Sequence, residues 1–137
     1  MYVLDTDVVS ELRKAGRADR HVVASSNVMP AFKLFLSAVT ILELELGVLQ
    51  VERRDPTQGG ALRGSLNNRV LPAFADRVLS IDTAVARRCA QLHVPDPMAD
   101  RDALIAATAL VHGMTVVTRN TADFVRSGVQ LINPWEC

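Results

Sequence analysis

The chain has 137 residues, of which 49% are hydrophobic, and its 15 basic and 15 acidic residues give a formal net charge of zero. This length predicts a single domain spanning residues 1–137 with a substantial core. A balanced charge argues against a protein that holds nucleic acid on a broad basic surface. The aromatic share of 4% argues against platforms on which bases stack.

The sequence also predicts the compartment. No apolar run approaches the length of a membrane span, so no membrane contact is expected. A basic segment followed by an apolar one, which would indicate a signal peptide, is not found at the start of the chain. Cys89 and Cys137 do not form the pattern of a disulfide framework. These features favour a protein of the reducing cytoplasm.

Short apolar runs alternate with helix-forming segments along the chain. Strands are predicted at residues 2–4, 33–37, 77–81, 114–118 and 129–132, the last at an edge of the sheet. Helices are predicted at residues 6–14, 18–28, 39–54, 61–71, 83–93, 101–112 and 121–126. Gly59 and Gly60 weaken any earlier start of the fourth helix. Alternation of this kind is typical of an α/β sandwich around a mainly parallel sheet.

The first strand ends at an acid, Asp5. A buried strand this close to the N-terminus is predicted to lie centrally in the sheet, and ligands of open α/β sheets bind at the carboxyl ends of the strands. Asp5 is therefore either a helix N-cap or a metal ligand. Asp7 is either a first-turn acid favoured by the helix dipole or a group that supports such a ligand.

The third predicted helix contains two acids, Glu43 and Glu45. Helical periodicity places Glu45 within the apolar arc and Glu43 outside it. Periodicity alone therefore singles out Glu45, either as a functional acid or as a partner of Arg53 or Arg54. Gly47 gives the opposite indication, because a missing side chain one turn after Glu43 leaves space for a substrate or an ion.

Asp100 is predicted to cap the helix at residues 101–112, which places Asp102 in its first turn. The face of Asp102 continues with Ala106 and Ala109. Small residues of this kind indicate close packing of the helix on the sheet. Such packing would carry Asp102 toward the carboxyl end of the strands.

Several polar residues follow the strand at residues 114–118 and are either loop residues or site residues. They include Thr118, Arg119, Asn120 and Asp123. The three histidines lack metal-ligand spacing and are expected at exposed or terminal helix positions, so zinc is not predicted. If Asp5, Glu43 and Asp102 converge, carboxylates about 4 Å apart repel by several kcal/mol. A hard divalent cation would relieve this repulsion and could activate water for attack on a phosphodiester.

Four segments, at residues 3–11, 36–47, 102–109 and 115–120, occur in this order, and Asn-Pro-Trp at 133–135 closes the chain. Together they resemble the PIN-domain ribonucleases, specifically the VapC/FitB-type toxins of bacterial toxin–antitoxin pairs. The E-L-x-x-G core from Glu43 to Gly47 is characteristic. The resemblance implies a three-layer α/β/α sandwich with a mainly parallel central sheet of four to five strands.

The resemblance also implies a function and a set of site residues. The expected function is an Mg²⁺- or Mn²⁺-dependent endoribonuclease that a cognate antitoxin neutralises. The expected assembly is a homodimer, or a hetero-tetramer or hetero-octamer with antitoxin. The implied catalytic residues are Asp5, Glu43, Asp102 and Asn120, of which the first three hold the metal. RNA would approach over the small faces around Gly47 and Ala106.

The sequence departs from the family pattern at two positions. Asp7 stands where the family often has Asn, and the neutral Asn120 stands at the fourth acidic position, which leaves open whether one or two metals bind. Asp7, Thr118 and Asp123 are expected to support the ligands. Arg119 is expected either to contact phosphate or to lie on the surface.

Two alternatives compete with the nuclease interpretation. A haloacid-dehalogenase-type phosphatase would use Asp5 as nucleophile and Asp7 as general acid. That class needs a later lysine, whereas the lysines here are Lys14 and Lys33. A non-enzymatic module that binds RNA or antitoxin is the other alternative, because Asn120 adds no charge to the site.

Overall fold

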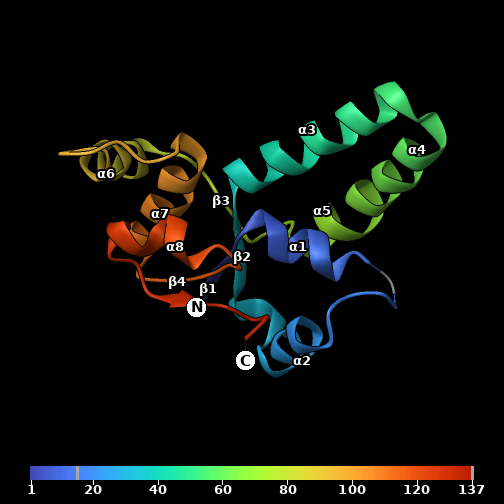
Figure 1. The fold of residues 1–137 in the computed structure, drawn as a ribbon, viewed down its shortest axis with the longest axis horizontal. Coiled ribbons are helices and arrows are strands. Elements are labelled where there is room, and N and C mark those ends of the chain that lie inside the picture. The colour runs from blue at the N-terminus through green and yellow to red at the C-terminus, as the bar shows by residue number, and fades with distance from the viewer. Residues whose placement is uncertain (15, 137) are drawn as a thin grey trace.

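Five parallel strands form the sheet in the computed structural model, which describes residues 1–14 and 16–136. The strand order is β3-β2-β1-β4-β5, so the first strand is the central one (Figure 1). The strands are β1 (Tyr2–Leu4), β2 (Leu34–Ser37), β3 (Val78–Leu79), β4 (Thr115–Val117) and β5 (Leu131–Ile132). The predicted parallel sheet, with β1 central and β5 at an edge, is confirmed.

The helices connect these strands and cover the sheet. They are α1 (Thr6–Leu12), α2 (Arg20–Val28), α3 (Ala38–Arg54), α4 (Pro56–Ser65), α5 (Leu71–Ala73), α6 (Thr83–Leu92), α7 (Asp100–His112) and α8 (Thr121–Phe124). Short 3₁₀ turns form η1 (Ala31–Lys33) and η3 (Val125–Ser127), and a π turn forms η2 (Leu66–Val70). Helices α3 and α4 make a hairpin that projects from the sheet (Figure 1).

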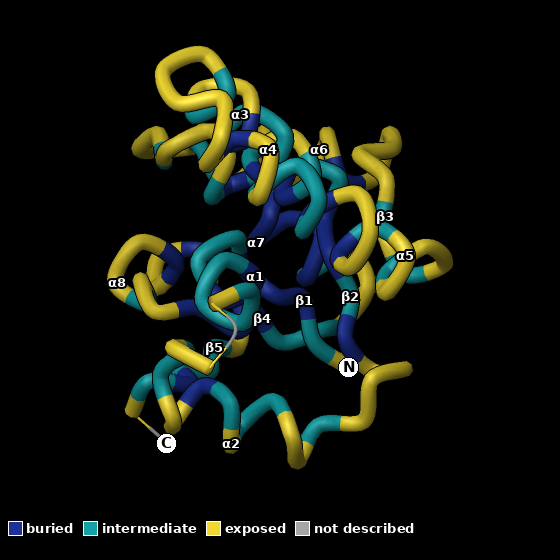
Figure 2. Tube along the Cα trace, turned by 90° about the vertical axis from the view of Figure 1, so that its right-hand side faces the viewer, coloured by how far each residue is buried: buried dark blue, intermediate teal, exposed yellow. Residues whose placement is uncertain are grey.

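The two faces of the sheet bury two separate cores. Leu4 and Leu36 pack with residues of α1, α2, α3 and η2. Val3 and Val116 pack with residues of α7 and α8 on the opposite face, because successive side chains of a strand point to opposite faces. Figure 2 shows the buried stretches gathered along β1 and α7. The predicted three-layer α/β/α sandwich is thus confirmed.

The helix predicted at residues 61–71 begins five residues earlier in the structure, at Pro56. Asp55 caps this start, since its side chain accepts a hydrogen bond from the backbone N–H of Gln58 at 3.1 Å. Gly59 is required there because a Cβ atom would lie 2.5 Å from the Cα of Glu52 on α3. Close packing of α4 on α3 therefore outweighs the weak helix propensity of glycine.

The predicted cap of α7 is wrong. Asp100 is already the first helical residue, and Ala99 holds the extended N-cap position without a side-chain cap. The side chain of Asp100 is 91% exposed, and its Oδ1 lies 3.5 Å from Nε2 of His93. Cys89 is a free, buried cysteine, whereas Cys137 lies outside the described residues. Among the helices described, none is both long and apolar enough to cross a membrane.

Candidate active site

Asp5 lies where β1 ends, and it is only 6% exposed. Its Oδ1 accepts a hydrogen bond from the backbone N–H of Thr6 at 2.8 Å, and its Oδ2 accepts one from the hydroxyl of Thr118 at 2.8 Å. Burial raises the pKa of Asp5, as do the charges of Glu43 and Asp123, while the two hydrogen bonds lower it. Asp5 therefore caps α1 and also lies among other acids.

Glu43 extends from α3 toward the same end of the sheet. Its Oε1 accepts a hydrogen bond from the hydroxyl of Thr6 at 2.7 Å, and that hydroxyl also lies 3.3 Å from the hydroxyl of Thr40. Its Oε2 lies 3.7 Å from Nη1 of Arg101, whose side chain is 50% exposed. Thr6 follows Asp5 directly, so its contact with Glu43 brings the two predicted acids to one place.

Glu45 points elsewhere, which corrects the indication from periodicity. Its Oε1 lies 2.8 Å from Nη1 of Arg63 on α4, and its Oε2 lies 2.6 Å from Nη2 of the same residue. Glu52 binds Arg63 as well, at 3.0 Å. The predicted partners Arg53 and Arg54 lie on the same helix, but α4 folds back and brings Arg63 to this face. Glu45 thus joins α3 to α4 through its ion pair with Arg63 and does not belong to the site.

Asp102 occupies the first turn of α7, as predicted. Its pKa is raised to about 6, mainly by burial and also by the charges of Asp5, Asp123 and Glu43. Among the described residues, none donates a hydrogen bond to its carboxylate. The charge of Asp102 is therefore not compensated by any hydrogen-bond donor of the described residues, although three other acids lie near it.

The small residues around Asp102 and Glu43 have two different environments. Ala106 and Ala109 are fully buried and pack α7 against β1 and β4. The expectation that RNA approaches over Ala106 is therefore wrong, because the sheet covers that face. A Cβ atom at Gly47, in contrast, would meet nothing within 4 Å. The space expected one turn after Glu43 is present.

Asp7 is held by the loop after β4. Its Oδ2 accepts hydrogen bonds from the backbone N–H of Arg119 at 3.1 Å and from the side-chain amide of Asn120 at 3.3 Å. Its Oδ1 is buried and has no partner within the described chain. The pKa of Asp7 is raised to about 6, mainly by burial and also by the nearby charge of Asp5. An oxygen of this kind is able to accept a cation or a proton.

Asn120 and Asp123 both lie near the acids, in different roles. Asn120 donates its amide N–H to Asp7, and its backbone N–H binds the hydroxyl of Thr118 at 3.0 Å. Asp123 is a first-turn acid of α8, as expected, yet its charge raises the pKa of both Asp5 and Asp102. Asp123 is therefore the fourth acid that acts electrostatically on this cluster.

Other groups near the cluster were not singled out from the sequence. A hollow of about 190 Å³ is lined by Asp102 and Asp123 together with Met98, Ala99, Ala122 and Arg126. Arg101 was also missed, although an arginine next to Asp102 in a first turn was a usable signal. The guanidinium of Arg119 lies 5.1 Å from the ring centroid of Trp135. This contact favours the surface interpretation of Arg119.

The donor chemistry of the acids fits a hard divalent cation. Within residues 1–14 and 16–136, no three His, Cys, Asp or Glu side chains lie close enough to hold a metal ion in their present rotamers. Carboxylate oxygens are nevertheless the ligands that Mg²⁺ and Mn²⁺ prefer. Burial is the main cause that raises the pKa of Asp5 and of Asp102, and the charges of neighbouring acids raise both further toward the neutral form, which a bound cation would counteract.

Comparison with known proteins decides the family. The PIN domain, as a sequence family, matches residues 2–128. The chain belongs to the PIN-domain family. This PIN domain is 40% identical to the VapC ribonuclease Y4jK of Sinorhizobium fredii over 144 aligned positions, which cover 99% of each chain. It is 37% identical to Toxin FitB of Neisseria gonorrhoeae, with 98% of this chain and 99% of the relative covered.

Solved structures agree with this assignment. The crystal structure of FitAcB from Neisseria gonorrhoeae matches this PIN domain with a TM-score of 0.91 and 35% identity, over 100% of both chains. The resemblance to VapC/FitB-type PIN domains that the four sequence segments indicate is confirmed.

Proposed function

We propose that this PIN domain is a metal-dependent endoribonuclease and the toxin of a toxin–antitoxin pair, formed as one domain by residues 1–137. The observation that carries the proposal is the group of acids at the carboxyl edge of the sheet. Burial raises the pKa of both Asp5 and Asp102, and neighbouring acids add to this: Glu43 and Asp123 for Asp5, and Asp5, Asp123 and Glu43 for Asp102. The relatives named VapC ribonuclease and Toxin FitB support the same conclusion.

Asp5, Glu43 and Asp102 would hold Mg²⁺ or Mn²⁺. The cation, when bound, activates water and stabilises negative charge on the phosphate. Thr118 fixes Oδ2 of Asp5, and Thr6 fixes Oε1 of Glu43. These hydrogen bonds orient the acids before substrate arrives, which avoids part of the reorganisation that the reaction would otherwise require.

Two further residues take roles in this proposal. Asp123 supplies the fourth negative charge, in place of the predicted Asn120, which instead orients Asp7 through its amide. Arg101 is half exposed beside Glu43, so its guanidinium is available to bind an RNA phosphate next to the scissile one. Phosphate contacts of this kind position RNA without reading its sequence.

The partners follow from the family. We propose a cognate antitoxin that blocks the acidic site and an assembly that contains a homodimer of this chain. The phosphatase alternative loses its support because the chain belongs to the PIN-domain family.

The test uses purified protein without antitoxin, a structured RNA, and Mg²⁺ or Mn²⁺. We expect cleavage that EDTA abolishes. Asp102→Asn should lower the rate by about 100-fold or more, since one ligand charge is lost. The matched control is Asp100→Asn on the same turn of α7, whose side chain is 91% exposed and which should keep the rate within about twofold.

A second pair of variants identifies the fourth acid. Asp123→Asn should lower the cleavage rate about tenfold, whereas Asn120→Ala should act only through Asp7 and cost less. Cleavage that persists in EDTA, or equal losses from Asp100→Asn and Asp102→Asn, would refute the metal-dependent mechanism. A folded protein that binds a structured RNA but cleaves none would favour the non-enzymatic alternative.

A further inference from the structure

The loop of residues 93–99 connects α6 to α7 and leads to the first turn of α7. It contains neither helix nor strand. Ala99 holds the N-cap position of α7 without a side-chain cap, and Asp102 lies in the turn that follows. The place of Asp102 therefore depends on what holds this loop.

His93 holds the loop from the end of α6, where it occupies the C-cap position. Its Nδ1 accepts a hydrogen bond from the backbone N–H of Met98 at 3.1 Å. Since Nδ1 accepts, the proton of the neutral ring is assigned to Nε2, which lies 3.8 Å from Sγ of Cys89 and 3.5 Å from Oδ1 of Asp100. A metal ion on Nε2 would require that nitrogen without its proton, so the contacts of His93 indicate a hydrogen-bonding role.

Met98 connects this hydrogen bond to the packing of α7. Met98 and Ala99 line the hollow of about 190 Å³ that Asp102 and Asp123 also line. The side chain of Met98 packs between α6 and α7 on a buried cluster of Val85, Cys89, Ala103 and Ala107. A shift of Met98 would therefore change both the wall of the hollow and the start of α7.

Arg126 holds the same loop from η3. Its Nη2 donates hydrogen bonds to the backbone carbonyls of Asp96 and Pro97, the latter at 3.4 Å. Because η3 follows α8 directly, Arg126 comes three residues after Asp123. The guanidinium therefore ties the segment that carries Asp123 to the loop that precedes Asp102.

The two acids make such a restraint necessary. The charge of Asp123 raises the pKa of Asp102, so the two carboxylates repel each other. Among the described residues, neither acid forms an ion pair with Arg126, which is used on the loop carbonyls instead. A loop without regular structure resists the repulsion of the acids only through contacts such as those of His93 and Arg126.

We propose that His93 and Arg126 are positioning residues, which hold the 93–99 loop at two points and thereby set the separation of Asp102 and Asp123 before a cation binds. This assignment rests on the proposed function, since the cation would contact the acids and not these two residues. Replacing hydrogen-bonding residues outside the ligand set typically changes metal affinity by about 10–100-fold.

The test measures binding of Mn²⁺ to the purified full chain at pH 8, by EPR of the free ion and without RNA. Exchange of the Met98 amide proton, followed by NMR, reports on the loop itself. His93→Asn and His93→Gln form a matched pair. The amide oxygen of Asn lies close to the position of Nδ1 and can accept the Met98 N–H, whereas the amide of Gln lies at the position of Nε2 and leaves that N–H without an acceptor.

We expect His93→Gln to weaken Mn²⁺ binding about tenfold and to speed exchange of the Met98 amide proton by a similar factor. His93→Asn should keep both within about threefold, because the hydrogen bond to Met98 is retained. A residue that only stabilises the fold would leave the Mn²⁺ affinity of the folded protein unchanged in both variants.

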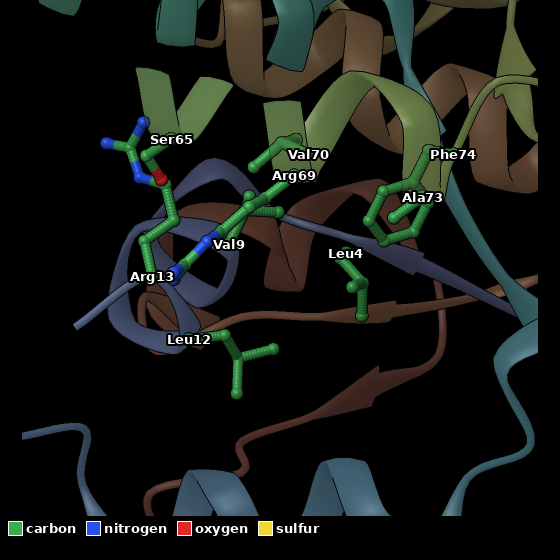
Figure 3. A pocket seen from close by; sticks show the side chains of 9 residues that line it. All are labelled: Leu4, Val9, Leu12, Arg13, Ser65, Arg69, Val70, Ala73 and Phe74. Atoms are coloured by element: carbon green, nitrogen blue, oxygen red, sulfur yellow. The ribbon is translucent and has the colours of Figure 1, made fainter. Parts of the chain in front are cut away.

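Arg126→Gln separates positioning from electrostatics. Loss of a positive charge near the acids would by itself tighten Mn²⁺ binding, whereas loss of the two carbonyl contacts should weaken it about tenfold. Arg69→Gln removes the same charge from η2, which packs on the opposite face of the sheet from α7. Figure 3 shows Arg69 extending from η2 toward α1. This control should stay within about twofold of wild type.

Three outcomes would each overturn the inference: equal losses from His93→Gln and His93→Asn, unchanged Mn²⁺ affinity in His93→Gln, or tighter binding by Arg126→Gln. If His93→Gln does not fold, Arg126→Gln and its Arg69→Gln control carry the test. RNA cleavage by the wild type is measured in parallel. A wild type that binds Mn²⁺ and shows the expected losses but cleaves no RNA would refute the nuclease proposal alone.

Discussion

The two ends of helix α1 carry opposite charges that the described chain does not balance. Asp5 and Asp7 lie at its start, near other acids, and Asp7 has a buried oxygen without a partner. Arg13 lies at its end with two buried nitrogens that also have no partner. The helix dipole favours these signs, but it contributes only about 0.3–1 kcal/mol per charge. The unpartnered atoms of Asp7 and Arg13 are therefore not fully compensated within the described chain.

The two regions differ in how they respond to their surroundings. Burial raises the pKa of Asp7 and of Asp102 to about 6, so these acids can lose their charge close to neutral pH. A guanidinium stays charged throughout this range. The charge of the acidic region therefore changes with pH close to neutrality, whereas the charge of the arginine region does not.

The largest expected effect separates the two glutamates of α3. Glu43→Gln should lower the rate of RNA cleavage about 100-fold, because Glu43 accepts a hydrogen bond from Thr6, which follows Asp5 directly. Glu45→Gln is the matched control and should leave the rate within about threefold, since Glu45 contacts Arg63 on α4. Initial rates under the same metal concentration give the comparison. Equal losses would mean that the acidic region is not confined to the face of Glu43.

Glu43 and Glu45 also show how far the sequence alone could predict the fold and the site. The central position of β1, the edge position of β5 and the three layers follow from local patterns and from the family segments, and the same segments nominate three site acids. Periodicity nevertheless favoured Glu45, because its partner Arg63 lies on a neighbouring helix and is invisible to a single-helix pattern. The same limit applies to Asp123, whose influence on Asp5 depends on where α8 packs. The unpaired nitrogens of Arg13 become evident only when η2 is placed over α1.

The next effect concerns stability against pH. The pKa of Asp7 and of Asp102 is about 6 in the folded protein and about 3.9 in an unfolded chain. Between these values the folded state binds more protons, so these two groups make stability fall as pH rises from about 4 to about 6. Asp7→Asn removes one such group and should raise the free energy of unfolding at pH 7.5 by about 1–2 kcal/mol after allowance for solvent screening.

Chemical denaturation of wild type and Asp7→Asn at several pH values measures this difference. The advantage of the variant should shrink as pH falls and approach zero below about pH 3, where wild-type Asp7 is protonated in both states. Acids with lowered pKa values, such as Glu11, contribute equally to both proteins and cancel in the comparison. A variant that is less stable than wild type at pH 7.5 would show that the carboxylate of Asp7 is compensated within the fold.

The smallest effect tests the arginine region in the same way. Arg13→Met keeps the length and apolar contacts of the side chain but removes its buried, unpaired charge. The free energy of unfolding should therefore stay level or rise by up to about 1 kcal/mol, and this difference should not vary between pH 5 and pH 8, because the guanidinium does not titrate there. Arg69→Met, at an exposed position, should change it by less than about 0.5 kcal/mol. A loss of more than about 2 kcal/mol from Arg13→Met would mean that the guanidinium stabilises the isolated fold. The charge of Arg13 would then be compensated within the protein, and the comparison between the two ends of α1 would fail.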